Sequence, residues 1–359
     1  MNDEFYRGRR VFITGHTGFK GAWLCLWLHS LGAEVAGYAL DPPTTPNIFD
    51  ICTIGEIITS TKGDVRDGVS LADAMKKFRP EIVVHMAAQP LVRDSYRLPR
   101  ETYEINVMGT VNLFEAVRAV DTVRAVVNVT TDKVYENKEW LWGYRENEPL
   151  GGYDPYSSSK ACSELVTSAY RDSFFNPEHY SQHGVGVATA RAGNVIGGGD
   201  WAVDRLVPDC ISALSKGEKI VIRNPNAIRP WQHALEPLHG YMLLGEKLFG
   251  EGDIFAGGWN FGPPQSEAKT VQWVAEKMAE AWGEKNAIMF DAASHPHEAS
   301  YLKLDCSKAE NILEWHPRWS TGEAIEKTVE WAIAYRQGAD IKELCLRQIA
   351  EYCQSLTGN

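Results

Sequence analysis

The stretch that decides the fold is residues 10–21, with the sequence RVFITGHTGFKG. It opens with a β-rich apolar run typical of a buried strand, and glycines follow at Gly15, Gly18 and Gly21. Apolar residues then recur at helical spacing up to Gly32, a plausible helix end. In such a strand–turn–helix unit, the glycines allow a tight turn, close approach of the backbone to a pyrophosphate, and close packing of helix on strand.

An acidic residue follows this turn at the distance that a dinucleotide site requires. The next strand, predicted from Glu34 to Leu40, ends at Asp41, about 20 residues after Gly21, where a carboxylate binds the 2′-hydroxyl of the adenosine ribose. No Lys or Arg lies between Glu34 and Lys62, so we expect no cation to neutralise a 2′-phosphate. The predicted cofactor is NAD rather than NADP, although a glycine pattern alone also fits a structural turn.

Four further positions are candidates for contact with the cofactor. Asp64 and Val65 follow another short strand, where Asp64 can bind the adenine amino group or, alternatively, cap the helix predicted after it. Ala87 lies at the end of the apolar run 81–88, where small residues let the backbone face the cofactor. Phe19 lies inside the glycine turn itself.

The order of strands and helices predicts an α/β protein. Six strand–helix repeats with apolar strands indicate a doubly wound parallel sheet of the Rossmann type. Beyond it the pattern becomes irregular, and most of the 12 Trp residues lie after position 200. We therefore expect a Rossmann domain at 1–192 plus about 233–258, and a smaller α+β substrate-binding lobe at 193–232 and 259–359.

A second apolar run carries polar residues at its carboxyl end. Residues 126–135 read VVNVTTDKVY, so a buried strand delivers Thr131, Asp132 and Lys133 side by side. Open parallel sheets bind ligands at the carboxyl ends of their strands. The stretch alone fits a strand that ends in a polar loop, and equally a catalytic site.

The helix predicted after Asp154 and Pro155 supplies a second pair of reactive groups. Tyr156 and Lys160 are four residues apart and share one face of this helix. An ammonium beside a phenol favours the phenolate, so we expect a lowered Tyr156 pKa and a tyrosine that accepts a proton near neutral pH. Together with the glycine turn and Thr131, the pair predicts a nicotinamide-dependent redox site.

The second lobe holds the candidates for substrate binding. A diphosphate needs cations, and Arg229, just before Pro230 and Trp231, is the first choice, with Arg205 second. An exposed surface position is the alternative for each arginine. Asn194 follows the last predicted strand of the sheet and is a third candidate.

Composition excludes several classes of partner. A net charge of −11 argues against binding to nucleic acid or anionic membranes, and no stretch of 18 apolar residues or apolar leader is present. The seven scattered cysteines indicate reduced thiols in a cytoplasmic protein. Two segments resemble metal sites, His179 with His183 and the segment His295-Pro296-His297-Glu298, but neither has a further ligand nearby, so we expect no metal site.

These motifs resemble the extended short-chain dehydrogenase/reductase family over nearly the full chain. Within it, Thr131–Lys133, Asn194 and the segment 229–232 are similar to the nucleotide-sugar 4,6-dehydratases. Lys133 narrows the resemblance to the branch that acts on CDP-glucose, since the dTDP-glucose and GDP-mannose branches carry Glu there. The resemblance implies a homodimer formed through helices near 102–119 and 156–175, and a role in making precursors of bacterial surface polysaccharide.

The resemblance also implies an internal redox cycle. Tyr156 takes the C4 hydroxyl proton, with Thr131 and Lys160 in support, while NAD takes the C4 hydride and later returns it to C6. Lys133 removes the C5 proton, and a protonated Asp132 donates to the departing C6 hydroxyl. Alternatively, Lys133 stays charged and stabilises the enolate while another group is the base.

Two other functions fit parts of the pattern. A nucleotide-sugar 4-epimerase or decarboxylase shares Tyr156 and Lys160, but it needs no acid and base after Thr131. A non-catalytic NAD-sensing module belongs to a different class, and such proteins usually lose the Tyr/Lys pair. The mass of the product and the presence of bound NAD distinguish these functions.

Overall fold

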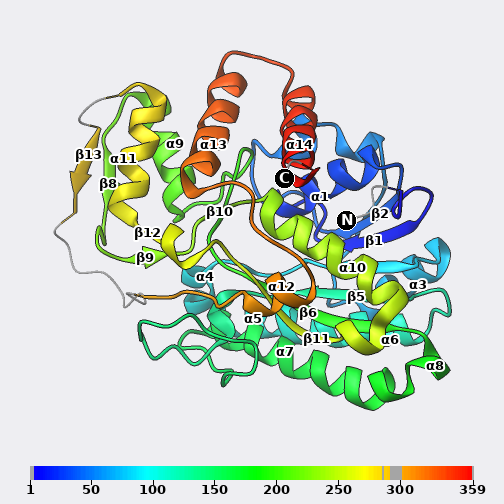
Figure 1. The fold of residues 1–359 in the computed structure, drawn as a ribbon. Coiled ribbons are helices and arrows are strands. Elements are labelled where there is room, and N and C mark those ends of the chain that lie inside the picture. Colours follow the sequence, from blue (N-terminus) through cyan, green and yellow to red (C-terminus); the bar gives the residue numbers. More distant parts are fainter. Residues whose placement is uncertain (1–3, 285–286, 292–300, 358–359) are drawn as a thin grey trace.

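A computed structural model describes residues 4–284, 287–291 and 301–357, so His295, His297 and Glu298 lie outside the described residues. A seven-stranded sheet forms its centre, in the order β11-β6-β5-β4-β1-β2-β3 (Figure 1). Every neighbouring pair is parallel, which confirms the predicted doubly wound sheet. The strands are β1 (Arg10–Thr14), β2 (Glu34–Ala39), β3 (Thr59–Lys62), β4 (Ile82–His85), β5 (Ala125–Val129), β6 (Gly186–Ala192) and β11 (Gly257–Phe261).

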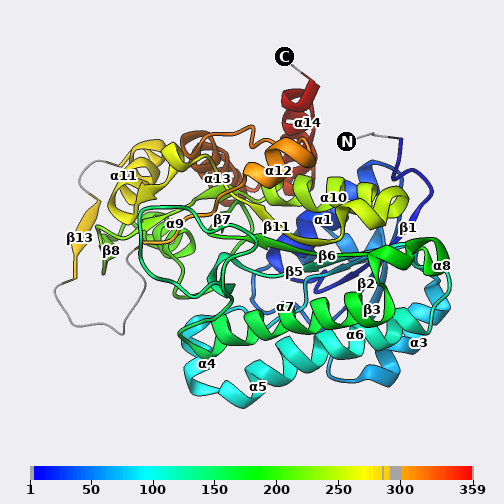
Figure 2. The same cartoon turned by 60° about the horizontal axis from the view of Figure 1, so that its bottom comes forward.

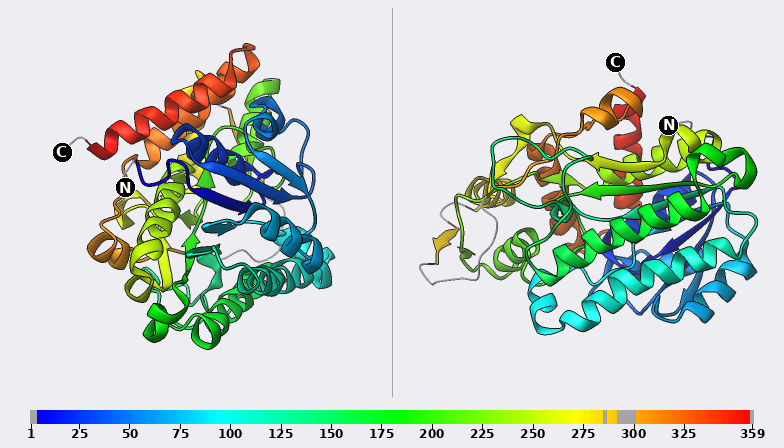
Figure 3. Two further views of the ribbon diagram at one scale, coloured as in Figure 1. Left: turned by 90° about the vertical axis from the view of Figure 1, so that its right-hand side faces the viewer. Right: turned by 90° about the horizontal axis from the view of Figure 1, so that it is seen from below.

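Helices cover both faces of the sheet, so its inner strands are apolar on both sides. Along β5, Val127 packs into the core under one face and Val126 into the core under the other. Figures 2 and 3 show the two helical layers. One layer contains α3 (Gly68–Phe78), α6 (Gly109–Arg118) and α7 (Pro155–Phe174), and the other contains α1 (Phe19–Ser30), α10 (Leu235–Phe255) and α14 (Ile341–Thr357).

A smaller lobe with its own apolar core lies beside the sheet, on the left in Figures 1 and 2. It contains α9 (Leu206–Lys216), α11 (Val271–Trp282), α13 (Thr321–Arg336) and three strand pairs: β8 (Ile220–Ile222) with β13 (Ile288–Phe290), β7 (Val195–Ile196) with β10 (Gln232–His233), and β9 (Ile228–Arg229) with β12 (Lys269–Thr270). Short helices elsewhere are α2 (Ile48–Ile51), α4 (Val92–Arg97), α5 (Pro99–Tyr103), α8 (Tyr180–His183) and α12 (Ser307–Ile312).

The expected return of the chain to the first domain corresponds to α10, which packs on β5 and β6. The expected boundary at 258 falls inside β11, and α14 packs on α1 of the sheet domain although its residues were assigned to the lobe. The division into two functional domains stays a prediction. Among the described residues, no helix has the length and apolar character needed to cross a membrane.

Candidate active site

Two of the three glycines in the turn after β1, Gly15 and Gly21, have no room for a side chain. Gly15 has a φ of +79°, and a Cβ there would come within 2.8 Å of the backbone of Met86 and Ala87 after β4. A Cβ on Gly21 would lie 2.2 Å from the Gly15 carbonyl oxygen. Gly18 is the N-cap of α1 and supplies no capping side chain, so the first N–H groups of the helix can bind an anion. This geometry fits a dinucleotide pyrophosphate.

Asp41 lies just beyond β2 and forms an ion pair with Lys62. Lys62 is the last residue of β3, whose parallel pairing with β2 brings it next to this position. The expectation that no cation is available near Asp41 is therefore wrong, because the neighbouring strand supplies one. Both side chains are well exposed, so their ion pair contributes little stability and leaves Asp41 able to bind a ribose hydroxyl instead. That contact stays a prediction.

Asp64 is held by its neighbour Arg66 rather than by a helix. Its carboxylate accepts hydrogen bonds from the Arg66 backbone N–H and guanidinium at 2.6–2.9 Å, and these bonds lower the Asp64 pKa. Asp67 is the residue that caps α3, accepting from Ser70 N–H at 3.0 Å. The alternative role of Asp64 as a helix cap is therefore wrong, whereas its adenine contact stays a prediction. Val65 is buried under the sheet.

The residues after β5 form the centre of the site. Thr131 is the N-cap of a short 3₁₀ turn, η3 (Asp132–Val134), and its hydroxyl donates to Asp132 Oδ1 at 2.9 Å. Asp132 is 1% exposed, and its Oδ2 has no hydrogen-bond partner among the described residues. A Cβ at position 193 would lie 2.1 Å from this oxygen, so Gly193 is what admits the carboxylate. An unpaired buried carboxyl oxygen is costly, and Asp132 lines the cavity in which a substrate hydroxyl would satisfy it.

Tyr156 and Lys160 lie in the first turns of α7, which begins at Asp154, a side-chain cap for Ser157 N–H. Burial lowers the pKa of Lys160 to about 8, and its Nζ donates to the Val129 carbonyl at 3.1 Å. Burial raises the pKa of Tyr156 to about 12, and hydrogen bonding to Thr131 offsets only part of this rise. The expected lowering of the Tyr156 pKa is therefore wrong, because desolvation outweighs the Thr131 hydrogen bond and the charge of Arg205.

A buried network fixes α7 against the ends of β5 and β6. Glu164, four residues after Lys160, pairs with Arg191 of β6 at 2.8 Å and accepts hydrogen bonds from Thr130 and Thr189. Both charged side chains are about 5% exposed or less, so each needs the other. The network therefore fixes the position of the helix that carries Tyr156 relative to the strand end that carries Thr131.

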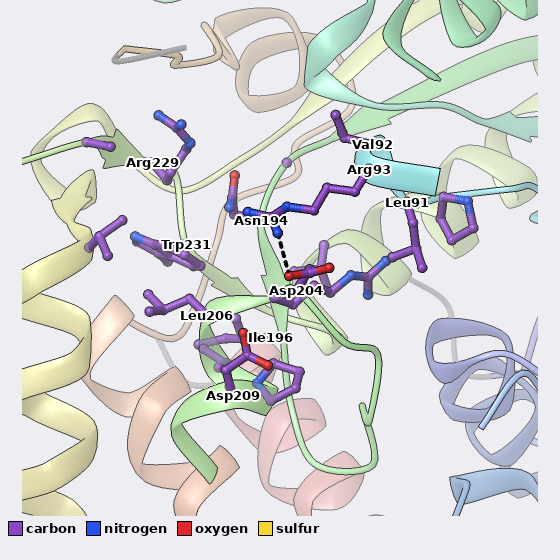
Figure 4. A pocket seen from close by; sticks show the side chains of 18 of the residues that line it. Leu91, Val92, Arg93, Asn194, Ile196, Asp204, Leu206, Asp209, Arg229 and Trp231 are labelled. Atoms are coloured by element: carbon purple, nitrogen blue, oxygen red, sulfur yellow. Dashed lines mark ion pairs between the residues drawn. The ribbon is translucent and has the colours of Figure 1, made fainter. Parts of the chain in front are cut away.

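A large cavity of about 1270 Å³ opens between the sheet domain and the lobe. Figure 4 shows Arg93 on one side of it and Asn194, Arg229 and Trp231 on the lobe side. The cavity brings together eight of the predicted site residues: Phe19, Thr131, Asp132, Lys133, Tyr156, Asn194, Arg205 and Arg229. The other predicted residues lie outside its lining: Gly15, Gly18, Gly21, Asp41, Asp64, Val65, Ala87 and Lys160.

The two predicted diphosphate ligands both face this cavity. Arg205 pairs with Asp200 at 3.0 Å, and Arg229 donates to the Ile228 carbonyl at 2.9 Å. Asn194 has a φ of +26°, and its carbonyl accepts from Gln232 N–H at 3.3 Å. The cavity is thus lined with arginines, as a diphosphate requires, while their contacts with substrate stay a prediction.

Lys20 is a site residue that the sequence patterns did not indicate. It lines the cavity, with its Nζ 5.6 Å from the centre of the Tyr241 ring. Burial, with the charges of Lys160 and Arg205, lowers its pKa to about 7, and Asp132 opposes this effect. One sequence feature could have indicated Lys20: it is a cation in the first turn of the helix that follows the glycine motif. The helix dipole makes a cation unfavourable at this position.

Comparisons with known proteins agree with this geometry. The family model described as GDP-mannose 4,6 dehydratase matches residues 12–328. The chain is 55% identical to a CDP-glucose 4,6-dehydratase of Salmonella typhimurium strain LT2, over 99% of both chains. The predicted family is thereby confirmed.

Solved structures show the same fold. One is a dTDP-glucose 4,6-dehydratase from Bacillus anthracis in complex with NAD, with a TM-score of 0.74, 22% identity, and 94% of this chain and 100% of that chain covered. A Thermus thermophilus UDP-glucose 4-epimerase in complex with NAD has a TM-score of 0.75 and 26% identity, with 89% of this chain and 98% of that chain covered. The chain therefore belongs to the nucleotide-sugar 4,6-dehydratases of the extended short-chain dehydrogenase/reductase family.

Proposed function

We propose that the protein is a hydro-lyase that converts CDP-D-glucose to CDP-4-dehydro-6-deoxy-D-glucose and water, with NAD as its cofactor. The observation that carries this proposal is the convergence of Asp132 and Lys133 with Tyr156 on one cavity. An epimerase needs Tyr156 but not the other two. The CDP-glucose 4,6-dehydratase relative, at 55% identity, supports the substrate.

Bound NAD would supply the acceptor and later the donor of one hydride. Tyr156 accepts the C4 hydroxyl proton, and Thr131, which interacts with both Tyr156 and Asp132, aligns the hydroxyl. Lys160, anchored on the Val129 carbonyl, adds a positive field that a phenolate requires. Burial outweighs the Thr131 hydrogen bond and the charge of Arg205 and holds the Tyr156 pKa near 12, so the positive charge of a bound nicotinamide ring would have to favour proton transfer from the substrate.

Elimination then depends on the two residues after Thr131. The C4 ketone acidifies the C5 proton, which Lys133 removes, and protonated Asp132 donates to the departing C6 oxygen. Lys133 Nζ lies 6.0 Å from the centre of the Tyr156 ring, so both groups reach one hexose ring. In the alternative role, a charged Lys133 only stabilises the enolate.

We also propose that the protein is a cytoplasmic homodimer that makes deoxysugar precursors of bacterial surface polysaccharide. Its dimer contact would use α6 and α7, with the short helix α5 that precedes α6; all three lie in the outer helical layer, the one that also contains α3 (Figure 2). Large apolar side chains are exposed on this layer, among them Met108, Leu165 and Phe174.

Turnover of CDP-, dTDP-, UDP- and GDP-hexoses, measured side by side on the purified NAD-bound protein, tests the substrate. We expect loss of one water from CDP-glucose at a rate at least about 100-fold above the others. Equal turnover of another nucleotide sugar would overturn the nucleobase assignment.

A further inference from the structure

We propose that Arg93 and Arg223 bind the substrate diphosphate from opposite sides of the cavity, and that Asp204 is the counter-ion which the diphosphate replaces. This inference rests on the proposed nucleotide-sugar substrate and adds two ligands and a displaced acid to it. Neither arginine belongs to a motif that the sequence patterns singled out.

The three side chains form one bridge across the cavity. Arg93 Nη1 lies 3.0 Å from Asp204 Oδ1, and Arg223 Nη2 lies 3.2 Å from the same oxygen. Arg93 belongs to α4 of the sheet domain, whereas Arg223 directly follows β8 of the lobe and Asp204 precedes α9. Figure 4 shows Arg93 extending from α4 past Asn194 to Asp204. All three residues line the cavity.

The position of the bridge suits the middle of an extended ligand. On one side lies Asn194, which also lines the cavity and follows Gly193, the residue packed on Asp132. On the other side, Arg223 marks the part of the cavity formed by β8. A hexose beside Asp132 and a nucleoside toward β8 place the diphosphate between them, next to both guanidiniums.

The charges favour exchange of Asp204 for a diphosphate. One carboxylate faces two guanidiniums, so the bridge has a surplus of positive charge. Asp209 also lines the cavity; burial raises its pKa, Arg223 and Arg93 lower it, and Asp204 raises it further. A diphosphate offers several charged acceptor oxygens, and guanidinium forks bind such groups in bidentate fashion.

Asp204 is also easy to displace. The three side chains are 36–40% exposed, and ion pairs of this exposure contribute little. A contact that is weak before substrate arrives is one that a better ligand replaces.

Calorimetric titration of the NAD-bound protein with CDP and with cytidine tests the proposal. We expect Arg93→Met and Arg223→Met each to raise the Kd for CDP by about tenfold or more and to leave the Kd for cytidine within about twofold. Arg347→Met is the control, since Arg347 on α14 pairs with Glu330 and Glu351 and does not line the cavity. It should change neither Kd by more than about twofold.

Asp204→Asn gives the decisive result, because it should lower the Kd for CDP several-fold by freeing both arginines. Weaker CDP binding in Asp204→Asn, comparable to that in Arg93→Met, would show that Asp204 holds the two arginines in place for binding. That result would overturn the proposal. An equal loss of CDP and cytidine binding in Arg93→Met would also overturn it. Titration with UDP and GDP separates the two proposals: Arg93-dependent binding of these nucleotides, without CDP preference, keeps the inference while the CDP assignment fails.

Discussion

Asp132 has the surroundings of a general acid. It is buried, one of its oxygens is fixed by the Thr131 hydroxyl, and the other has no partner within the described residues. A carboxyl group in this position can form a hydrogen bond with a hydroxyl placed in the cavity. Burial on Gly193 is what distinguishes it from an exposed acid at a strand end.

Asp132→Asn should separate oxidation from dehydration. We expect the rate of water loss to fall about 100- to 10,000-fold, because the acid is gone, while oxidation at C4 continues. Stopped-flow absorbance of the cofactor follows the first step, and mass spectrometry of the product follows the second. Asp172→Asn, at an exposed position of α7, is the control. Undiminished dehydration in Asp132→Asn would assign the acid role to another group.

Lys133→Met distinguishes the two roles of this lysine. If Lys133 is the base, incubation with substrate in D2O should give about 100-fold less deuterium at C5 than the wild type does. The measurement is the NMR signal of C5 in recovered substrate and product. Normal exchange at C5 with slow overall turnover would leave Lys133 only the role of stabilising the enolate.

At the scale of elements, Glu236 of α10 ties three segments together. Its carboxylate accepts from the backbone N–H groups of Arg318 and Trp319 and from the Tyr352 hydroxyl of α14. Burial raises its pKa from the ordinary value of 4.5 to about 7, and these hydrogen bonds offset part of the rise. A group with a raised pKa favours folding below its unfolded value and loses that contribution as the pH rises through its folded value.

Glu236→Gln should therefore remove one source of pH dependence. Between pH 5 and pH 8, the free energy of unfolding of the wild type should fall relative to that of the variant by as much as about 3 kcal/mol. Urea unfolding of both proteins at the two pH values measures this difference. The contributions of all other titrating groups are the same in both proteins and therefore cancel. Parallel pH profiles would contradict the raised pKa.

The sequence predicts the sheet well because most of its inner strands are short runs dominated by apolar residues, as in β1 and β4, and strand ends such as Thr131 follow from them. It predicts less well what depends on contacts between distant segments. Lys62 reaches Asp41 only through the pairing of β3 with β2, and Arg93 meets Asp204 only across the cavity. The Tyr156 pKa was predicted in the wrong direction because its degree of burial cannot be read from the spacing of Tyr156 and Lys160.

At the scale of the molecule, the exposed apolar side chains of the outer helical layer provide a test of the proposed dimer. Leu165 on α7 is 58% exposed, and Leu165→Glu should weaken dimerisation at least about 100-fold by placing a charge in the contact. Ile254, 61% exposed on α10 in the opposite layer, gives the control Ile254→Glu, which should stay dimeric. Light scattering during size-exclusion chromatography measures both masses. A dimeric Leu165→Glu protein would exclude this surface as the contact.

The most direct test of the account follows a single label through the reaction. CDP-glucose carrying deuterium at C4 is incubated with the NAD-bound protein, and the product is examined by mass spectrometry and NMR. The account predicts a product lighter by one water, with the deuterium at C6, because Asp132 and Lys133 complete an elimination between oxidation and reduction. A product of unchanged composition with the deuterium still at C4 and the C4 configuration inverted would contradict it.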